Sequence, residues 1–529
     1  MECSLLAEFI FNYDFMVHLI LKLLFLAMLL AGCSDNDTEN QSSIRPFNIL
    51  TKELDVELSN SSNELITLSW ERTYSSNNAS VFYKVLFAGE DGDFSNPIAS
   101  IKSDKGGYAT SISFRHNELD NIAASCGISE GQKGVLYWTV LAESGTSQYL
   151  HPQGCALQVT RIHSDDVNPQ VVYWEEAADS LNSVLVSQFL NKEKGIFWGS
   201  AQNAKNNSDI LYWQQAHYMD VLIYAYERLS GSIDSSKKRL AAEYENYFRL
   251  WLQNHANNWH TPNSFYNGYT DDMCWMVLTL LHMNAATKDE RYYKEAKQLY
   301  DNDIITRASD NDGYGWALPW NDQNSVRIAC TNNPACIAAS LLYARTNDLK
   351  YLDHAKKLYD YIVKRIMSVD GKLEETALSY TQGTFIEAAR LLYHHTQDPT
   401  YLKKAEYVMR QTLEAGWCTK NGLLRNEGTS ADQSIFKAIF VPYAVNFILD
   451  TTVDRSMRIL ARDFLLYNAE TLWKNNLDRK KWPRMFCSFY WGEIWSDANE
   501  NEFKGSTGAH ASGCSLIENV ARMLKYCSI

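Results

Sequence analysis

The sequence predicts a mainly α-helical protein, with an (α/α)6 toroid at residues 166–529 preceded by an antiparallel β-sandwich at residues 47–165. Two observations support this division. From about residue 170 onward, apolar side chains recur with helical periodicity, and a helix-pair repeat runs through the region. Before that point, apolar and polar side chains alternate with the period of two that is typical of strands.

The helical region contains an internal repeat. Each copy has an apolar segment with a Leu-Leu pair, then a Thr-x-Asp tripeptide, and a Tyr three residues after the Asp; the copies begin at Thr287, Thr346 and Thr396. A buried helix, a tight turn whose Asp caps the next helix, and an amphipathic helix explain this pattern. At this period the region holds about six helix pairs, which close into a toroid with the apolar helices inside. Their N-termini should meet at one face.

Strand periodicity is clearest in four segments of the N-terminal region. Their alternating positions are Ile66, Leu68 and Trp70; Val81, Tyr83, Val85 and Phe87; Tyr108, Thr110, Ile112 and Phe114; and Leu136, Trp138, Val140 and Ala142. Polar turns separate these segments, as in an antiparallel sandwich. Residues 65–70 resemble the Trp-bearing second strand of fibronectin type III modules, and such domains also occur in SusE-like surface glycan-binding lipoproteins. We expect this domain to be a spacer, with sugar binding as the alternative.

Residues 1–33 are expected to be a signal peptide that ends in a lipobox. The apolar stretch 19–32 is too short for a membrane-spanning helix, and Leu30-Ala31-Gly32-Cys33 resembles a bacterial lipobox. The resemblance implies cleavage before Cys33 and lipidation of its thiol. Because residues 1–15 make a poor n-region, Met16 is the expected true start. The acidic tether 34–46 resembles that of Bacteroides-like surface lipoproteins, which implies an outer-membrane protein facing outward, with a periplasmic location as the alternative.

The composition excludes some partners. A net charge of −14 argues against nucleic acid, because phosphate binding needs patches of Lys and Arg. Fifteen Trp and 31 Tyr are many for this length, and flat aromatic rings suit the CH-rich faces of sugars. The eleven Cys show no zinc-ligand spacing, so no metal site is expected. Pairing of Cys126 with Cys155, and of Cys330 with Cys336, is left open.

Two adjacent acids, Asp271 and Asp272, stand where a polar loop turns into the apolar run 276–281. Acids are rarely held at the edge of a core without a partner or a role. Neighbouring residues can place their carboxyl groups about 5 Å apart, the separation found in retaining glycosidases. Two close carboxylates cannot ionise independently, so one becomes an anion while the other keeps its proton. The alternative is that the pair only caps the helix and complements its dipole.

Four polar motifs each open an apolar helix: Trp213–His217, Thr270–Trp275, Thr331–Pro334 and Tyr380–Phe385. Their order and spacing over about residues 170–525 resemble glycoside hydrolase family 76, the α-1,6-mannanases. The resemblance implies an (α/α)6 barrel, a retaining mechanism and no cofactor. It also implies Asp271 as the nucleophile and Asp272 as the acid/base.

Other residues near these helix starts are candidate substrate contacts, because amides bind sugar hydroxyls and aromatic rings stack on sugars. They are Gln214, His217, Trp275, Trp316, Trp320, Asn332, Tyr380, Gln382 and Thr384. The alternative for His217 is a hydrogen-bonded core residue, and for Trp316 and Trp320 it is a role in sealing the barrel. Glu374 and Glu375 form a second acid pair, which we expect to cap the helix that follows it.

The sequence therefore predicts a lipid-anchored glycoside hydrolase that cleaves α-1,6-mannan backbones internally. The expected partners are the α-mannan polysaccharide, a membrane through the lipid, and an outer-membrane glycan-uptake complex, with no nucleic acid. One alternative is another (α/α)6 sugar enzyme, such as an unsaturated-uronyl hydrolase, which would need a basic pocket. The other is a surface glycan-binding lipoprotein without turnover.

Overall fold

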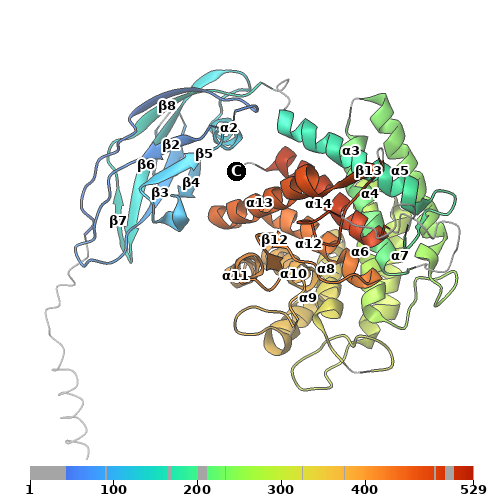
Figure 1. Cartoon of the computed structure of the whole chain (residues 1–529). Helices are drawn as coiled ribbons and strands as arrows, with labels where there is room; N and C mark the ends of the chain where they lie inside the picture. The colour runs from blue at the N-terminus through green and yellow to red at the C-terminus, as the bar shows by residue number, and fades with distance from the viewer. Residues whose placement is uncertain are drawn as a thin grey trace, which may run out of the picture.

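The computed structural model describes residues 43–529, apart from 63, 90–91, 164–167, 201–210, 233, 325, 375, 482–483, 495–504 and 528. The expected signal peptide, the lipobox with Cys33 and most of the tether therefore lie outside the described residues. Within the described residues, no helix has the length and apolar character needed to cross a bilayer. The chain forms a β domain followed by a ring of helices (Figure 1).

The β domain has two sheets that enclose one core. Its strands are β1 (Glu53–Glu57), β2 (Ile66–Ser69), β3 (Phe82–Ala88), β4 (Ala99–Lys102), β5 (Ser111–Phe114), β6 (Lys133–Ser144), β7 (Ser147–Leu150) and β8 (Cys155–Thr160). The larger sheet has the order β1-β8-β6-β3-β4, with β7 also paired to β6, and the smaller sheet consists of β2 and β5. The predicted alternation is confirmed at Leu68, Val85, Ile112 and Val140, which are all completely buried.

Three features differ from the predicted antiparallel sandwich. Strands β1 and β8 pair in parallel, from Glu53 beside Ala156 to Glu57 beside Thr160. A helix, α2 (His116–Ser125), follows β5 and adds apolar side chains to the same core. The strand predicted to begin at Tyr108 begins only at the first residue of β5, and Tyr108 itself is exposed.

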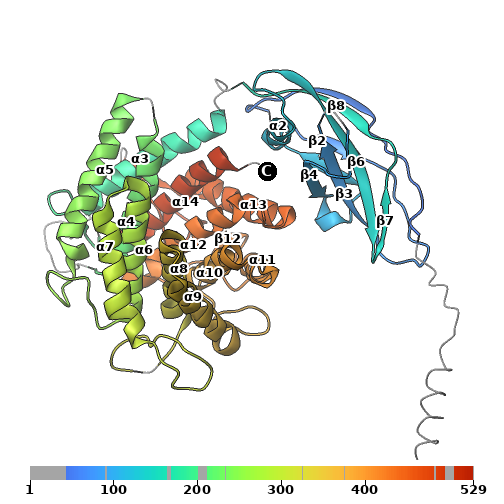
Figure 2. The ribbon, with the colours of Figure 1, turned by 180° about the vertical axis from the view of Figure 1, so that it is seen from behind.

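The helices of the second domain form two concentric rings. The inner ring consists of α4 (Gln214–Ser230), α6 (Thr270–Thr287), α8 (Ala329–Thr346), α10 (Ser379–Thr396), α12 (Ala431–Leu449) and α14 (Thr507–Tyr526). The outer ring consists of α5 (Ser235–Gln253), α7 (Glu290–Leu299), α9 (Leu349–Tyr361), α11 (Pro399–Glu414), α13 (Arg455–Glu470) and α3 (Pro169–Phe189). Each inner helix packs against the next, and α14 closes the ring on α4 (Figures 1 and 2). The predicted (α/α)6 toroid is confirmed.

Short elements lie in the connecting loops. They are η1 (Lys105–Gly107), β9 (Leu190–Asn191), β10 (Ile196–Phe197), η3 (His255–Asn257), η4 (Tyr300–Ile304), η5 (Ile305–Arg307), η6 (Ile362–Ile366), β11 (Thr419–Lys420), β12 (Leu423–Leu424), η7 (Thr471–Asn476), β13 (Asp478–Lys481) and β14 (Arg484–Phe486). The cysteines in the described part of the chain are all free, so neither pairing left open by the sequence, Cys126 with Cys155 or Cys330 with Cys336, is a disulfide.

The tight turn predicted from the Thr-x-Asp repeat is present in all three copies. In the middle copy, the Thr346 hydroxyl donates to the carbonyl of Leu342 and accepts from the backbone N–H of Asp348. The Asp348 carboxylate then caps α9 by accepting from the backbone N–H of Lys350 at 3.0 Å. Between them, Asn347 has a φ of 56° and ends α8 in the left-handed conformation. The turn thus folds each outer helix back along its inner helix.

An arginine fastens the β domain to the toroid. Arg455, the first residue of α13, makes a bidentate ion pair with Glu118 of α2, at 2.6 and 2.8 Å, and also reaches Asp104 at 3.2 Å. Glu118 is 6% exposed, so losing either partner would leave a buried charge. Because α12 and α13 are antiparallel, Arg455 lies at the face of the ring where the inner helices end, opposite the face where they begin.

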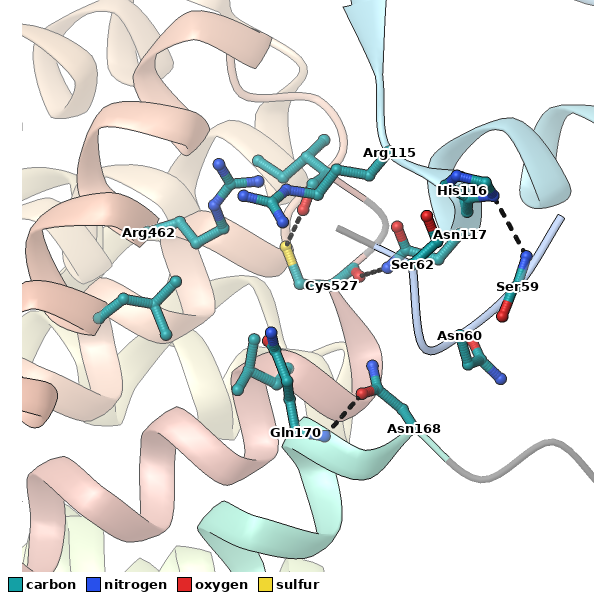
Figure 3. A pocket seen from close by; sticks show the side chains of 13 residues that line it. Ser59, Asn60, Ser62, Arg115, His116, Asn117, Asn168, Gln170, Arg462 and Cys527 are labelled. Carbon is teal, nitrogen blue, oxygen red and sulfur yellow. Dashed lines mark hydrogen bonds between the residues drawn. The ribbon is translucent and has the colours of Figure 1, made fainter. Parts of the chain in front are cut away.

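A small pocket lies beside this contact, between the two domains (Figure 3). Asn117 donates to the carbonyl of Cys527 across it, at 3.1 Å, and His116 accepts from the backbone N–H of Ser59 at 3.2 Å. With a volume of about 50 Å³ it has room for only a few water molecules. It is part of the domain contact.

Candidate active site

A cavity of about 440 Å³ opens at the face where the inner helices begin. The lining side chains come from the first two turns of α6, α8, α10 and α12 and from the loops before the inner helices. They are Trp213, His260, Tyr269, Asp271, Asp272, Trp275, Trp320, Ile328, Cys330, Glu374, Tyr380, Asp432 and Phe436. Within the described residues, no group of three or more His, Cys, Asp or Glu side chains is placed to hold a metal ion.

The two adjacent acids begin α6 and point into this cavity. Asp271 Oδ2 accepts a hydrogen bond from Trp320 Nε1 at 3.1 Å and one from Cys330 Sγ at 3.6 Å. Asp272 Oδ2 accepts from Asn267 Nδ2 at 3.1 Å. The helix has no side-chain cap, and the backbone N–H of Thr270 is bonded to the carbonyl of Trp320 at 2.8 Å. Asp271 also accepts from backbone N–H groups of the first turn. The bonds from Trp320, Cys330 and Asn267 give the pair contacts beyond the helix cap that the sequence left as an alternative.

The two carboxyl groups differ in pKa, and burial raises the pKa of both. Desolvation raises the pKa of Asp271 to about 6, although the hydrogen bonds from Trp320 and Cys330 favour its anion. The pKa of Asp272 is raised well above its usual value, first by desolvation and then by the negative charges of Asp271 and Asp432. The first proton lost from the pair therefore leaves Asp271 as the anion, while Asp272 stays protonated.

A third carboxylate, Asp432, lies across the cavity in the first turn of α12. Its Oδ1 accepts from Trp213 Nε1 at 3.1 Å and also from Gln214 Nε2. Sequence reasoning missed this residue, although it is the second residue of its helix, as Asp271 is of α6. Its position at the start of an apolar inner helix was the signal that could have found it.

Aromatic rings form the walls of the cavity. Tyr380 stacks on Phe436 with ring centroids 4.1 Å apart and an interplanar angle of 17°, and Trp213 stacks on the same Phe436 ring at 6.3 Å. On the other side, Tyr269 packs against Trp320 at 5.2 Å. Aromatic walls around a few convergent polar groups are typical of small-molecule sites. The arrangement can hold a neutral, ring-shaped ligand against the acid pair.

Comparison with known proteins agrees with this geometry. Residues 173–523 match the model of glycosyl hydrolase family 76. The chain belongs to this family. Residues 34–141 match a second family model, described as SusE outer membrane protein. The resemblances to family 76 and to SusE-like proteins that the sequence indicated are confirmed. A search of curated protein sequences gave no match.

Solved structures of family 76 glycoside hydrolases resemble the toroid. An α-1,6-mannanase of Salegentibacter sp. HEL1_6 is 27% identical over 66% of this chain and 99% of its own, with a TM-score of 0.56. An inactive variant of it, with two consecutive aspartates changed to asparagine, was solved with α-1,6-mannotriose; it is 26% identical over the same shares, also with a TM-score of 0.56. A family 76 mannosidase from Bacteroides thetaiotaomicron, 17% identical over 66% of this chain and 98% of its own, with a TM-score of 0.52, shares the fold.

The family 76 domain brings some of the predicted contact residues to the cavity. Trp275, Trp320 and Tyr380 line it. Gln214 is buried and meets the cavity through its hydrogen bond to Asp432. His217 lies beneath Trp275, with ring centroids 4.9 Å apart, so it supports that ring from below.

Other predicted contacts lie elsewhere in the domain. Trp316 packs on His354 at 5.2 Å and does not line the cavity. Asn332, Gln382 and Thr384 are completely buried. Asn332 bonds the backbone N–H and carbonyl of Leu318, Gln382 bonds the backbone N–H of Leu373, and Thr384 donates to the carbonyl of Tyr380. These polar side chains hold the loops and helix turns that carry cavity residues.

Glu374 has a different role from the predicted one. Its Oε1 accepts from the backbone N–H of Ala329 at 2.5 Å, so it caps α8 and not the helix that follows it. It also lines the cavity, and its φ of 67° is a left-handed backbone conformation that is unfavourable for a glutamate. Glu427 caps Ser379 of α10 in the same way, which makes capping by the next loop a recurring feature of the ring.

Replacing Trp320 by phenylalanine should raise the pKa of Asp271 further. The change keeps the ring but removes the N–H that favours the Asp271 anion. A hydrogen bond to a charged group contributes about 1.5–3 kcal/mol, so we expect the acidic limb of the pH–rate profile for hydrolysis to move up by about one to two pH units. Trp473→Phe, in the outer segment η7, should leave the limb in place. An unmoved limb in Trp320→Phe would contradict this role for the indole.

Proposed function

We propose that this chain is a retaining glycoside hydrolase that cleaves α-1,6-mannosidic bonds within mannan backbones. The observation that carries the proposal is the pair of adjacent, desolvated carboxyl groups, of which Asp271 ionises first. The likeness to an α-1,6-mannanase that is inactive when two consecutive aspartates are replaced, and that was solved with α-1,6-mannotriose, supports the substrate.

In this mechanism the two acids act in sequence. The Asp271 anion attacks the anomeric carbon while Asp272 gives its proton to the glycosidic oxygen, so the C–O bond breaks and the leaving sugar departs as an alcohol. A glycosyl ester on Asp271 results. Water then attacks the same carbon as Asp272 takes its proton, which releases Asp271 as a carboxylate. Two inversions at one carbon retain the anomeric configuration.

The aromatic walls and the opening of the cavity support internal cleavage of a polymer. Trp275, Trp320 and Tyr380 would stack on the sugar faces next to the scissile bond. Tyr269 at the rim is 38% exposed, so a sugar chain can continue past it to the surface. In this proposal Gln214 and His217 keep the cavity side chains in place from behind.

The charge of the lining disfavours the alternative of an unsaturated-uronyl hydrolase. Among the described residues that line the cavity, four are acids and none is Lys or Arg. A uronate carboxylate in this cavity would meet carboxylates and no matching cation. A neutral mannan chain avoids this repulsion. A binding protein without turnover would have no use for a buried pair of coupled acids, since their desolvation is unfavourable unless it serves a reaction.

We further propose that the mature chain is anchored in the outer membrane through lipid on Cys33 and faces the cell exterior within a glycan-uptake complex. The match of residues 34–141 to a SusE outer membrane protein model supports the location. The placement of the β domain at the face opposite the cavity would leave the cavity open to a polymer.

Substitution of either acid should abolish hydrolysis. With debranched α-1,6-mannan, the wild type should release a ladder of oligosaccharides, and Asp271→Asn and Asp272→Asn should each lose at least about a thousandfold in rate, because each removes one chemical role. Asp289→Asn is the matched control and should keep the ladder, because Asp289 caps α7 just beyond the far end of the helix that carries the acid pair. No products from wild type, with retained binding to the glycan, would favour the binding-protein alternative.

Lipidation has a separate test. Growth with labelled palmitate should label the wild-type protein, and Cys33→Ala should remove the label and release the protein from the membrane fraction. A Cys33→Ala protein that stays labelled would contradict the anchor.

A further inference from the structure

An exposed tryptophan stands beside the cavity with its face open to solvent. The Trp259 side chain is 61% exposed. Its ring stacks on His260 with centroids 3.5 Å apart and an interplanar angle of 29°. His260 in turn lines the cavity. The outer face of this stack is therefore a flat aromatic surface directly outside the cavity.

The backbone that leads to this stack is strained. His255, Ala256 and Asn257, which form η3, have φ values of 47°, 51° and 56°, a left-handed conformation that is unfavourable for most residues other than Gly and Asn. Ala256 is completely buried, and the His255 ring packs on Phe265 at 5.1 Å, so the surroundings hold the strained turn. Persistent strain of this kind gathers at binding and catalytic sites, where it presents a side chain in one orientation.

A single buried side chain fixes the loop on the other side of the strained turn. Asn258 is 5% exposed, and its Nδ2 donates to the carbonyls of Ser264 and Tyr266 at 2.8 and 2.7 Å. Its Oδ1 accepts from the backbone N–H groups of His260 and Thr261 at 3.1 and 3.3 Å. All four hydrogen bonds that the Asn258 side-chain amide can make are therefore made within this loop. The stack is thus preorganised, although Trp259 itself fills no core.

A row of rings joins the stack to the acid pair. His260 lies 6.5 Å from Tyr269, Tyr269 lies 5.2 Å from Trp320, and the Trp320 indole donates to Asp271. Burial lowers the pKa of His260, so its ring is neutral at neutral pH. The row therefore offers uncharged aromatic faces from the cavity outward, which suits the CH faces of a neutral sugar chain.

We propose that Trp259 and His260 form a sugar-binding platform outside the cavity, which holds mannan residues several units away from the bond that is cleaved. The inference rests on the proposed function, since it takes the ligand to be the same neutral α-1,6-linked chain. The platform makes the enzyme selective for long substrates. A chain that ends inside the cavity does not reach the Trp259 ring, whereas a polymer gains an additional sugar stacked on it.

The test compares kcat/KM on debranched α-1,6-mannan with kcat/KM on α-1,6-mannotetraose. Trp259→Ala should reduce the polymer-to-tetraose ratio by about tenfold, the upper end of what a single aromatic stacking contact contributes, mainly through KM for the polymer. Trp259→Phe, which keeps a flat ring, should restore most of the ratio. Tyr526→Ala is the matched control, because Tyr526 is 64% exposed at the end of α14, on the opposite face, and its ratio should equal that of wild type.

The outcomes separate the platform from the proposed function. A wild type that cleaves mannan, with an unchanged ratio in Trp259→Ala, would overturn the platform alone. A wild type that cleaves neither substrate would overturn the proposed function and the platform with it. A reduced ratio that Trp259→Phe does not restore would show that the loop, and not the ring face, sets the preference, and would also overturn the platform.

Discussion

Two carboxyl groups held side by side in a poorly solvated cavity are the constraint on which this structure depends. Each would ionise near its usual pKa in water, but burial opposes both anions, and each charge opposes the other. The surroundings make the pKa values of the two carboxyl groups differ. Trp320 and Cys330 donate to Asp271, whereas Asp432 adds negative charge near Asp272. One acid is therefore an anion while its neighbour keeps a proton, the state that a double displacement needs.

The closed ring of helices holds the acid pair and its hydrogen-bond partners in place, so the difference between the two carboxyl groups is maintained. Every inner helix begins at the same face and has an inner neighbour on each side, so no helix start can shift alone. The loops between helices are fixed by buried amides: Asn332 holds the backbone at Leu318, two residues before Trp320, and Asn258 holds the loop with Trp259. Arg455 joins the β domain to the face where the inner helices end, opposite the face that carries the acid pair.

The fold and the acid pair could be predicted from the sequence because the signals for both are local. A repeated Thr-x-Asp turn and apolar helices predict a toroid, and adjacent aspartates at a helix start are visible without coordinates. The direction in which a side chain points depends on the packing of the whole domain and cannot be predicted from a local pattern. Asn332 and Gln382 were predicted to contact sugar because they are polar residues near the starts of apolar helices. Each is in fact buried and makes hydrogen bonds with backbone groups. The parallel pairing of β1 with β8 joins strands about 100 residues apart, beyond the reach of periodicity.

The measurement that tests the central claim most directly is peptide mapping by mass spectrometry of the Asp272→Asn variant after reaction with an aryl α-mannoside. The activated leaving group departs without a proton from residue 272, but without the base the glycosyl ester is hydrolysed slowly and accumulates. A hexose adduct on Asp271 is the predicted result. An adduct on Asp432 or Glu374, or release of product with inverted configuration and no adduct, would contradict the assignment of the two acids.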